Sequence, residues 1–277
     1  MLKRAIYLLF ALSVLMTGCS LEKKIARTFV QADPPAQFLL LKPDFIFKNN
    51  LKTFEIPGID TLDEYKRDSL LLENSLVLKD ITDSVLIREF NNAFVKRLEL
   101  YGSVVVPQDA VDTLMQNGGE PYVLNIAQFS LEEFLHPYSN EEIVYDEILV
   151  IDGFDVNAIS FNIWIEVGRM NTEKKNKVLF TSDYLTDDIH GILRQNLFTG
   201  KIMFDYTIDT ITSTMTYEFA RNFGKMTAEY IFDYLMNMYV LEMLPENYPY
   251  DPYYYHYDPE RKLFFTIDED QRIIELE

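Results

Sequence analysis

The stretch that decides the fold runs from Ser213 to Leu241 and reads STMTYEFARNFGKMTAEYIFDYLMNMYVL. Its large apolar side chains recur at steps of three and four residues, the spacing of one face of an α-helix. They are Phe219, Phe223, Met226, Tyr230, Tyr234, Met238 and Leu241. Pro245 follows and cannot continue a helix. The spacing predicts one long amphipathic helix that packs on another layer.

The residues before this helix have the alternation of β-strands. Apolar and polar residues alternate after Lys201, and Val178–Tyr184 is expected to pair antiparallel with the β-rich stretch Ile143–Val167. Within that stretch the apolar positions change from even to odd numbers at Ala158-Ile159. A shift by one residue moves every later side chain to the other face, so this change predicts a β-bulge.

The amino-terminal half alternates between strand and helix patterns. The expected strands are Phe38–Leu41, Ser103–Val106 and Tyr122–Ala127. The expected helices run from a capping Asp83 or Ser84 to Tyr101 and over Pro107–Gln116. A polar excursion with a short helix near Leu62–Leu72 is expected over 48–82, and a loop or short turn of helix over 130–142. The order β-α-β-α-β-β-β-α predicts an α/β (α+β) fold. We expect a mixed sheet of about five or six strands, with helices on one face and the long helix near the C-terminus.

The first residues, MLKRAIYLLFALSVLMTGCS, resemble the signal and lipobox of bacterial lipoproteins. Lys3 and Arg4 precede an apolar run that is too short to span a bilayer, and small residues lead to Cys19. The resemblance implies cleavage after Gly18 and acylation of Cys19. Ser20, where an Asp would favour the inner membrane, implies the outer membrane, facing the periplasm or the cell surface. The alternatives are an ordinary secretory signal or a short uncleaved anchor.

The chain divides into four expected parts. These are a lipoprotein signal peptide (1–18), a tether (19–36), a single α/β domain (37–244), and a Tyr- and Pro-rich arm with a terminal hairpin (245–277). The hairpin is expected from two apolar runs, Leu263–Phe265 and Ile273-Ile274, around a short acidic segment.

The charge and the single cysteine limit the chemistry. The chain has 44 Asp and Glu against 25 Lys and Arg, a net charge of −19, which is unsuited to nucleic acid. Cys19 is the only cysteine, so an intrachain disulfide, a thiolate zinc site and a cysteine nucleophile are excluded. We expect the membrane, through the acyl anchor, and an unknown envelope protein as partners.

The body resembles the α/β domain of the curli-export lipoprotein and the amino-terminal domain of the Tol-system propeller protein. The segments that carry the resemblance are FLLL, LIREFNNAFVKRLELYG, SVVVP, YVLNIA, ISFNIWIEVG, KVLFTSDY and FARNFGKMTAEYIFDYLM, within residues 38–241. Members of this group serve mostly as binding or assembly modules. The resemblance therefore implies a protein-interaction role without catalysis.

The candidates for chemistry are few. Asp183, Asp187, Asp188 and His190 could hold a divalent cation, and the alternative is an acidic solvated loop. His136 with Glu132 or Glu133 could form an acid–base pair, and the alternative is a loop surface. No cofactor is expected, because the sequence has neither a phosphate-binding glycine motif nor GxSxG.

A tyrosine cluster is the remaining candidate. Tyr253, Tyr254, Tyr255 and Tyr257 could dock a partner or stack on a glycan, or could belong to an arm folded back on its own domain. Trp164 falls on the opposite parity from its apolar neighbours and is expected to face away from them. Three hypotheses follow: an envelope adaptor or assembly lipoprotein, a carboxylate- and His-dependent hydrolase, and a glycan- or peptide-binding lipoprotein.

Overall fold

The computed structural model describes residues 20–52, 58–116, 121–144, 147–170, 175–200, 202–267 and 272–276. Residues 1–19, with the predicted cleavage and acylation sites at Gly18 and Cys19, lie outside the described residues. The described helices are α2 (Leu21–Val30), α3 (Glu64–Glu73), α4 (Asp83–Leu100), α5 (Val111–Gln116) and α6 (Ser213–Met243), with short 3-10 helices at Ile59–Thr61, Leu78–Asp80 and Gln108–Ala110. Within the described residues, no helix is long and apolar enough to cross a membrane.

A mixed sheet of seven strands forms the body, which confirms the predicted α/β fold class. Its strands are β1 (Gln37–Leu41), β2 (Phe47–Asn50), β3 (Val104–Pro107), β4 (Tyr122–Val144), β5 (Glu147–Arg169), β6 (Lys177–Thr186) and β11 (Ile274–Leu276). The order is β11-β6-β5-β4-β1-β3, and β2 pairs with β4 away from this path. The contacts of β1 with β3 and β4 are parallel, while β4, β5, β6 and β11 pair antiparallel.

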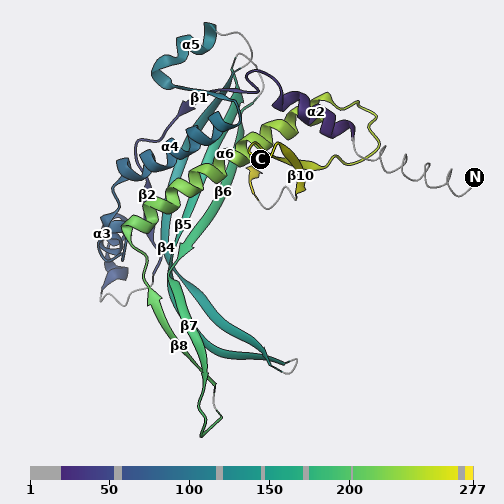
Figure 1. The fold of residues 1–277 in the computed structure, drawn as a ribbon. Coiled ribbons are helices and arrows are strands. Elements are labelled where there is room, and N and C mark those ends of the chain that lie inside the picture. The colour runs from purple at the N-terminus through teal and green to yellow at the C-terminus, as the bar shows by residue number, and fades with distance from the viewer. Residues whose placement is uncertain are drawn as a thin grey trace, which may run out of the picture.

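The long helices α4 and α6 lie side by side across one face of the sheet (Figure 1). Phe90 of α4 and Phe223 of α6 meet Phe161 of β5 and Phe129 of β4 in the buried core. Gly224 permits the close crossing, since a Cβ there would lie 2.4 Å from the backbone oxygen of Phe90. The short helix α5 packs on the opposite face of the sheet, so the expectation that helices cover one face only was wrong.

The ends of the long helices follow local chemistry. The predicted long helix near the C-terminus is confirmed as α6. The side chain of Thr212 caps it by accepting a hydrogen bond from Met215 N. The cap of α4 expected at Asp83 or Ser84 does not form. Thr82 occupies the cap position without a side-chain bond, and Asp83 instead pairs with Lys48 at 2.6 Å. Asp83 therefore fixes β2 to the start of α4.

The strands β4 and β5 form a ribbon that extends beyond the helices, next to a separate hairpin of β7 (Asp188–Gln195) and β8 (Ile202–Asp209) (Figure 1). The loop or short turn of helix expected over 130–142 was wrong, because β4 continues through these residues to Val144. Polar residues on a ribbon with an uncovered face do not show the alternation that the prediction required.

The expected bulge at Ala158-Ile159 was also wrong, because both residues pair in continuous register with β4. Register shifts occur instead between Ile126 and Gln128 and between Asn140 and Glu141. The apolar parity changes because the covering layer changes sides. Ile159 and the odd positions after it face the helices, whereas Phe154 stacks on Tyr206 of β8 with ring centroids 4.6 Å apart.

Trp164 alternates with the core-facing residues of β5 and points to the other face of the sheet. Its ring packs against that of Phe180 on β6, with ring centroids 4.8 Å apart. This contact forms on the sheet face away from the long helices, which is the side predicted for Trp164. The ring therefore belongs to a small aromatic pair and not to the main core.

The chain ends fold back on the body. The expected tether is largely helix α2, whose Ala26 and Phe29 are buried against α6. The expected terminal hairpin was wrong: β10 (Leu263–Ile267) pairs with β9 (Tyr254–Asp258), and β11 joins β6 at the sheet edge. The two last apolar runs therefore belong to two different sheets.

Candidate functional site

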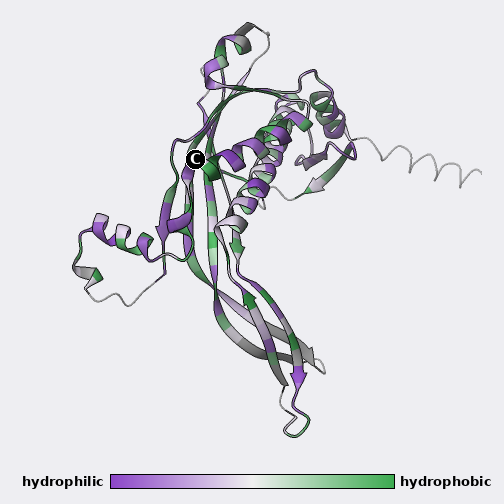
Figure 2. Cartoon of the chain, turned by 60° about the vertical axis from the view of Figure 1, so that its left-hand side comes forward, coloured by the Kyte–Doolittle hydropathy of each residue, from purple (hydrophilic) through white to green (hydrophobic). Residues whose placement is uncertain are grey.

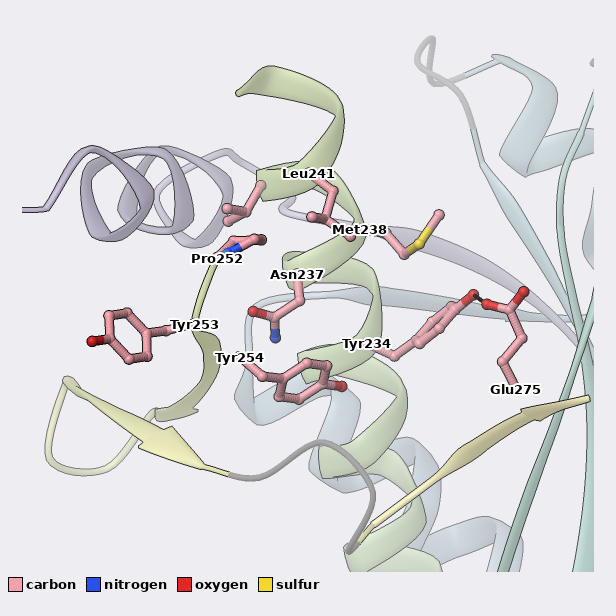
Figure 3. Close-up of a pocket in the computed structure, with 9 residues that line it drawn as sticks. Tyr234, Asn237, Met238, Leu241, Pro252, Tyr253, Tyr254 and Glu275 are labelled. Carbon is pink, nitrogen blue, oxygen red and sulfur yellow. Dashed lines mark hydrogen bonds between the residues drawn. The ribbon is translucent and has the colours of Figure 1, made fainter. Parts of the chain in front are cut away.

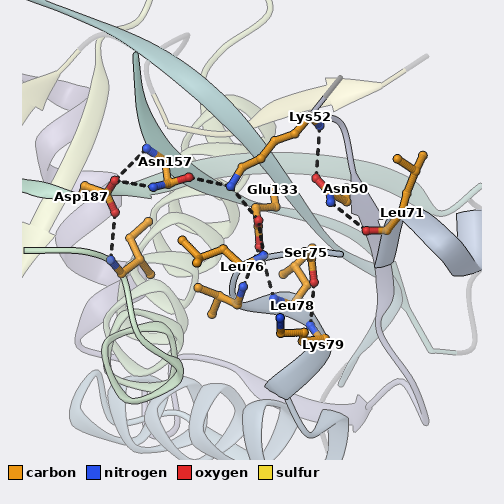
Figure 4. Close-up of polar contacts among 12 residues, drawn as sticks. Asn50, Lys52, Leu71, Ser75, Leu76, Leu78, Lys79, Glu133, Asn157 and Asp187 are labelled. Carbon is orange, nitrogen blue, oxygen red and sulfur yellow. Dashed lines mark hydrogen bonds and ion pairs between the residues drawn. The ribbon is translucent and has the colours of Figure 1, made fainter. Parts of the chain in front are cut away.

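A buried ion pair lies where the helix-covered body meets the projecting ribbon (Figure 4). Oε1 of Glu133 on β4 is 2.8 Å from Nζ of Lys52, and both side chains are buried. The N–H groups of Leu76, Val77 and Leu78 donate to the same carboxylate at 2.7, 3.0 and 3.3 Å. Burial alone would raise the pKa of Glu133, but Lys52 and these N–H groups hold the pKa below its usual range. Glu133 is therefore ionised and fastens the excursion to the sheet.

The same network reaches the base of the β7–β8 hairpin. Lys52 donates to Oδ1 of Asn157 at 2.6 Å, and Asn157 donates to Asp187 from its backbone N at 2.8 Å and from Nδ2 at 2.7 Å. The N–H of Ile211, just before α6, donates to the second oxygen of Asp187 at 2.9 Å. The hairpin thus begins and ends at positions that hydrogen bonds fix to β5.

The tip of this hairpin is apolar and exposed. Leu197 is 93% exposed and Phe198 is fully exposed. Oδ1 of Asn196 accepts hydrogen bonds from Phe198 N at 2.9 Å and Thr199 N at 3.1 Å, which hold the turn that presents both side chains. The sequence from Ile189 to Phe204 contains no Asp or Glu, although the chain carries 44 of them. Figure 2 shows hydrophobic segments along this projecting hairpin.

The predicted metal candidates do not converge. Both oxygens of Asp187 accept hydrogen bonds in the interior, and Oδ1 of Asp183 accepts from the neighbouring Tyr184 N. His190 lies at the surface, with Nε2 3.3 Å from Asp188 and 3.4 Å from Asp209. In the described part of the chain, no group of three or more His, Cys, Asp or Glu could hold a metal ion.

The predicted pair of His136 with Glu132 or Glu133 does not form. Glu133 is committed to Lys52, and Glu132 accepts from Nδ2 of Asn162 at 3.3 Å. The His136 ring instead packs against Tyr184, with ring centroids 5.2 Å apart. No acid–base chemistry follows from these residues.

The tyrosine cluster divides between the interior and the surface. Tyr255 and Tyr257 are buried, and the hydroxyl of Tyr255 donates to Glu22 of α2 at 3.0 Å. Asn237 of α6 bonds the backbone N and O of Tyr255 at 2.8 and 2.7 Å. Tyr253 remains 65% exposed. Two of the four predicted binding residues therefore hold the arm on its own domain.

A charged cluster that the sequence analysis missed also holds the arm. Oδ2 of Asp233 lies 2.7 Å from Nδ1 of His256 and 3.1 Å from Nη1 of Arg272, while Oδ1 accepts from Tyr257 N at 3.1 Å. Burial raises the pKa of Asp233 above its usual range, against the opposing bond to His256. No local sequence pattern marked it, because Asp233 lies within α6, His256 and Tyr257 lie on β9, and Arg272 lies just before β11.

Beside the arm lies a hollow of about 190 Å³ between α6, the arm and β11 (Figure 3). Tyr253 and Tyr254 border it on one side. Across it the hydroxyl of Tyr234 donates to Oε2 of Glu275 at 2.7 Å. The Tyr254 ring and the polar groups of Asn237 and Glu275 lie on the inner side of the arm, whereas the exposed ring of Tyr253 points to its other side (Figure 3).

The chain matches no known protein family and no curated protein sequence. The β7–β8 hairpin combines a base fixed by hydrogen bonds with an exposed apolar tip.

Proposed function

We propose that this protein is a lipid-anchored adaptor of the outer membrane, fastened by acylated Cys19 and docking an envelope protein through the tip of the β7–β8 hairpin. The observation that carries the proposal is the complete exposure of Phe198 beside the nearly fully exposed Leu197. Apolar side chains gathered at an exposed tip are typical of an interaction site. Acylation at Cys19 and the outer-membrane location are parts of the same proposal.

The position of α2 supports a short link between anchor and body. Ser20 directly follows Cys19 in the sequence and caps α2, accepting from Lys23 N at 3.2 Å. Phe29 of α2 packs on Phe232 and Tyr239 of α6. An acyl group on Cys19 would hold the body close to the lipid surface, because a docked helix and not a long coil follows it.

The fixed base of the hairpin supports docking by a rigid element. Asp187 lies at the start of the hairpin and Ile211 just after its end. The carboxylate of Asp187 accepts hydrogen bonds from the N–H of Ile211 and from the N–H of Asn157 on β5. A projection held in this way loses little conformational freedom when its tip is buried by a partner. Leu197 and Phe198 would supply the apolar contact.

The test is site-specific photo-crosslinking in intact cells. A photoreactive phenylalanine analogue replaces Phe198, and a control chain carries it at Tyr65, which is also strongly exposed but lies on α3. We expect a discrete crosslinked envelope protein from position 198 that is absent from position 65. Crosslinks to lipid alone, or equal products from both positions, would contradict the adaptor proposal.

Ligand binding at the arm is the second candidate function, supported by exposed Tyr253 beside the hollow of Figure 3. Deletion of the arm cannot test it, because Tyr255 and Tyr257 belong to the core. Tyr253→Ala removes the exposed ring without opening the core. The candidate would be supported if the unaltered chain binds a glycan on an array and the Tyr253→Ala variant does not. Unchanged binding in the variant would exclude the Tyr253 ring as the binding residue.

A further inference from the structure

The residue that follows Cys19 is bonded to the arm from the other end of the chain. Oγ of Ser20 lies 2.9 Å from the hydroxyl oxygen of Tyr255. The buried carboxylate of Glu22 accepts a hydrogen bond from Tyr255 at 3.0 Å and another from Tyr248 at 2.7 Å. These bonds hold the start of α2 against the arm. The arm therefore lies beside the point where an acyl anchor would enter the lipid.

Two tyrosine rings of this part of the arm are exposed. Tyr250 is 74% exposed and Tyr253 is 65% exposed, and the Tyr253 ring points away from α6 (Figure 3). Pro249 and Pro252 precede them and restrict the backbone that carries them. Leu21, the first residue of α2, is also 44% exposed. Tyrosine combines an apolar ring with a polar hydroxyl, which suits it to the boundary between lipid headgroups and acyl chains.

The outer side of α2 is cationic. Residues Lys23–Arg27 carry three cations, and Glu22, the one acid of the helix, is buried. The neighbouring part of the arm adds two exposed acids, Glu246 and Asp251. The cations are therefore in excess at this end of a chain whose net charge is −19. This excess attracts anionic headgroups, whereas a surface with the average charge of the chain would be repelled by them.

We propose that this end of the molecule lies on the bilayer surface and binds the phosphate headgroups of anionic phospholipids. We call the exposed side chains that would touch the lipid the anchor face; they are Leu21, Lys24, Arg27, Tyr250 and Tyr253. The cations contact phosphate, and the leucine and the tyrosine rings enter the headgroup layer. The inference rests on the proposed acylation, because the acyl anchor brings this face to the lipid.

The anchor face would also set the orientation of the body on the membrane. The tip of the β7–β8 hairpin lies at the end of the molecule away from α2 (Figure 1, Figure 2). With the anchor face on the bilayer, Leu197 and Phe198 would therefore point away from the lipid, toward the docked protein. The exposed ring of Tyr253 would contact lipid instead of a glycan.

The test measures contact with lipid at single positions of the acylated chain, purified from its membrane fraction and reconstituted into vesicles. The vesicles contain phosphatidylethanolamine and phosphatidylglycerol, and a nitroxide on some acyl chains quenches nearby fluorophores. Tyr253→Cys introduces a thiol for the fluorophore NBD, and Tyr65→Cys on α3, also strongly exposed, is the matched control. We expect NBD at position 253 to emit at shorter wavelength than at position 65 and to be quenched severalfold more strongly.

Charge reversal tests the part of the cations. Lys24→Glu with Arg27→Glu, in the chain labelled at position 253, should reduce the quenching severalfold, because the new carboxylates are repelled by phosphatidylglycerol. Lys79→Glu with Lys225→Glu makes the same change of charge at exposed positions outside the anchor face and should leave the quenching unchanged. Each variant is checked for an unchanged thermal unfolding midpoint. If the α2 variant unfolds, the comparison of position 253 with position 65 decides.

The number of labels separates failure of this inference from failure of the anchor. Cys19 is the only natural cysteine, so an acylated chain with Tyr253→Cys takes one label, and a chain with a free Cys19 thiol takes two. Two labels would overturn the proposed anchor and this inference with it. With one label, the anchor face alone would be overturned by equal quenching at positions 253 and 65. Quenching that a folded α2 variant leaves unchanged would overturn it as well.

Discussion

The carboxylate of Glu133 and the ammonium of Lys52 lie 2.8 Å apart in the interior, although they come from distant parts of the sequence. The pair fastens the polar excursion to β4, and Asn157 extends the network to the base of the β7–β8 hairpin. A buried charge is tolerated only when it is paired and hydrogen-bonded. The integrity of this junction should therefore depend on both charges.

Glu133→Gln should lower the free energy of unfolding by about 3–5 kcal/mol, because it leaves the ammonium of Lys52 buried without its counter-charge. Urea unfolding followed by circular dichroism measures the change. Glu132→Gln, one residue earlier and on the opposite side of β4, is the control and should cost less than about 1 kcal/mol. Equal effects of the two variants would show that the ion pair does not support the fold.

The same carboxylate predicts an acid-sensitive component of stability. Because the pKa of Glu133 is lower in the folded protein than its ordinary value of 4.5, its contribution is present above that value. The contribution is lost as the pH falls through the folded pKa. The difference in unfolding free energy between the unaltered chain and Glu133→Gln should therefore shrink below about pH 4.5. A difference that stays constant or grows on acidification would contradict this assignment.

The elements predicted correctly are those whose pattern is local. The spacing of Phe219, Phe223 and Met226 marks α6 correctly as a helix. Its burial differs from the predicted single face, because Ile231–Asn237 are buried all round and Leu241 is 54% exposed. The alternation after Lys201 marks β8, because the period of side chains on a strand is two residues, although Tyr206 and Ile208 remain 38% and 39% exposed.

The errors arose where the burial of a residue depends on a distant partner. Ala158 and Ile159 are both buried, by layers on opposite sides, which a single strand pattern cannot distinguish from a bulge. Ile274 pairs with β6 and not with β10, which is nearer in the sequence. Nothing local marks Glu133 or Asp233 as a buried charge, because their partners are brought to them only by the fold.

Gly224→Ala should destabilise the protein, although alanine is the better helix former. The new Cβ would lie 2.4 Å from the backbone oxygen of Phe90, so α4 and α6 must separate. We expect the free energy of unfolding, measured by thermal and urea unfolding, to fall by about 1–3 kcal/mol. Asn222→Ala, an exposed position of the same helix, should be neutral or slightly stabilising. A more stable Gly224→Ala chain would refute the close helix crossing.

Tyr255→Phe should loosen α2 from the body. It removes the hydroxyl that donates to the buried Glu22 at 3.0 Å, leaving that carboxylate with Tyr248 at 2.7 Å. We expect the free energy of unfolding to fall by about 1–3 kcal/mol. Limited trypsin digestion should cut sooner within α2, after Lys23, Lys24 or Arg27, than in the exposed-site control Tyr253→Phe. Identical digestion of the two variants would mean that this bond does not hold α2.

Intact-mass analysis of the protein purified from its membrane fraction tests the proposed acylation of Cys19 most directly. We expect a chain that begins at Cys19, with residues 1–18 removed, and carries a diacylglycerol on the sulfur and an acyl group on the new amino terminus. A chain with an unmodified Cys19 thiol, or one recovered from the cytosol with its first residues intact, would contradict it.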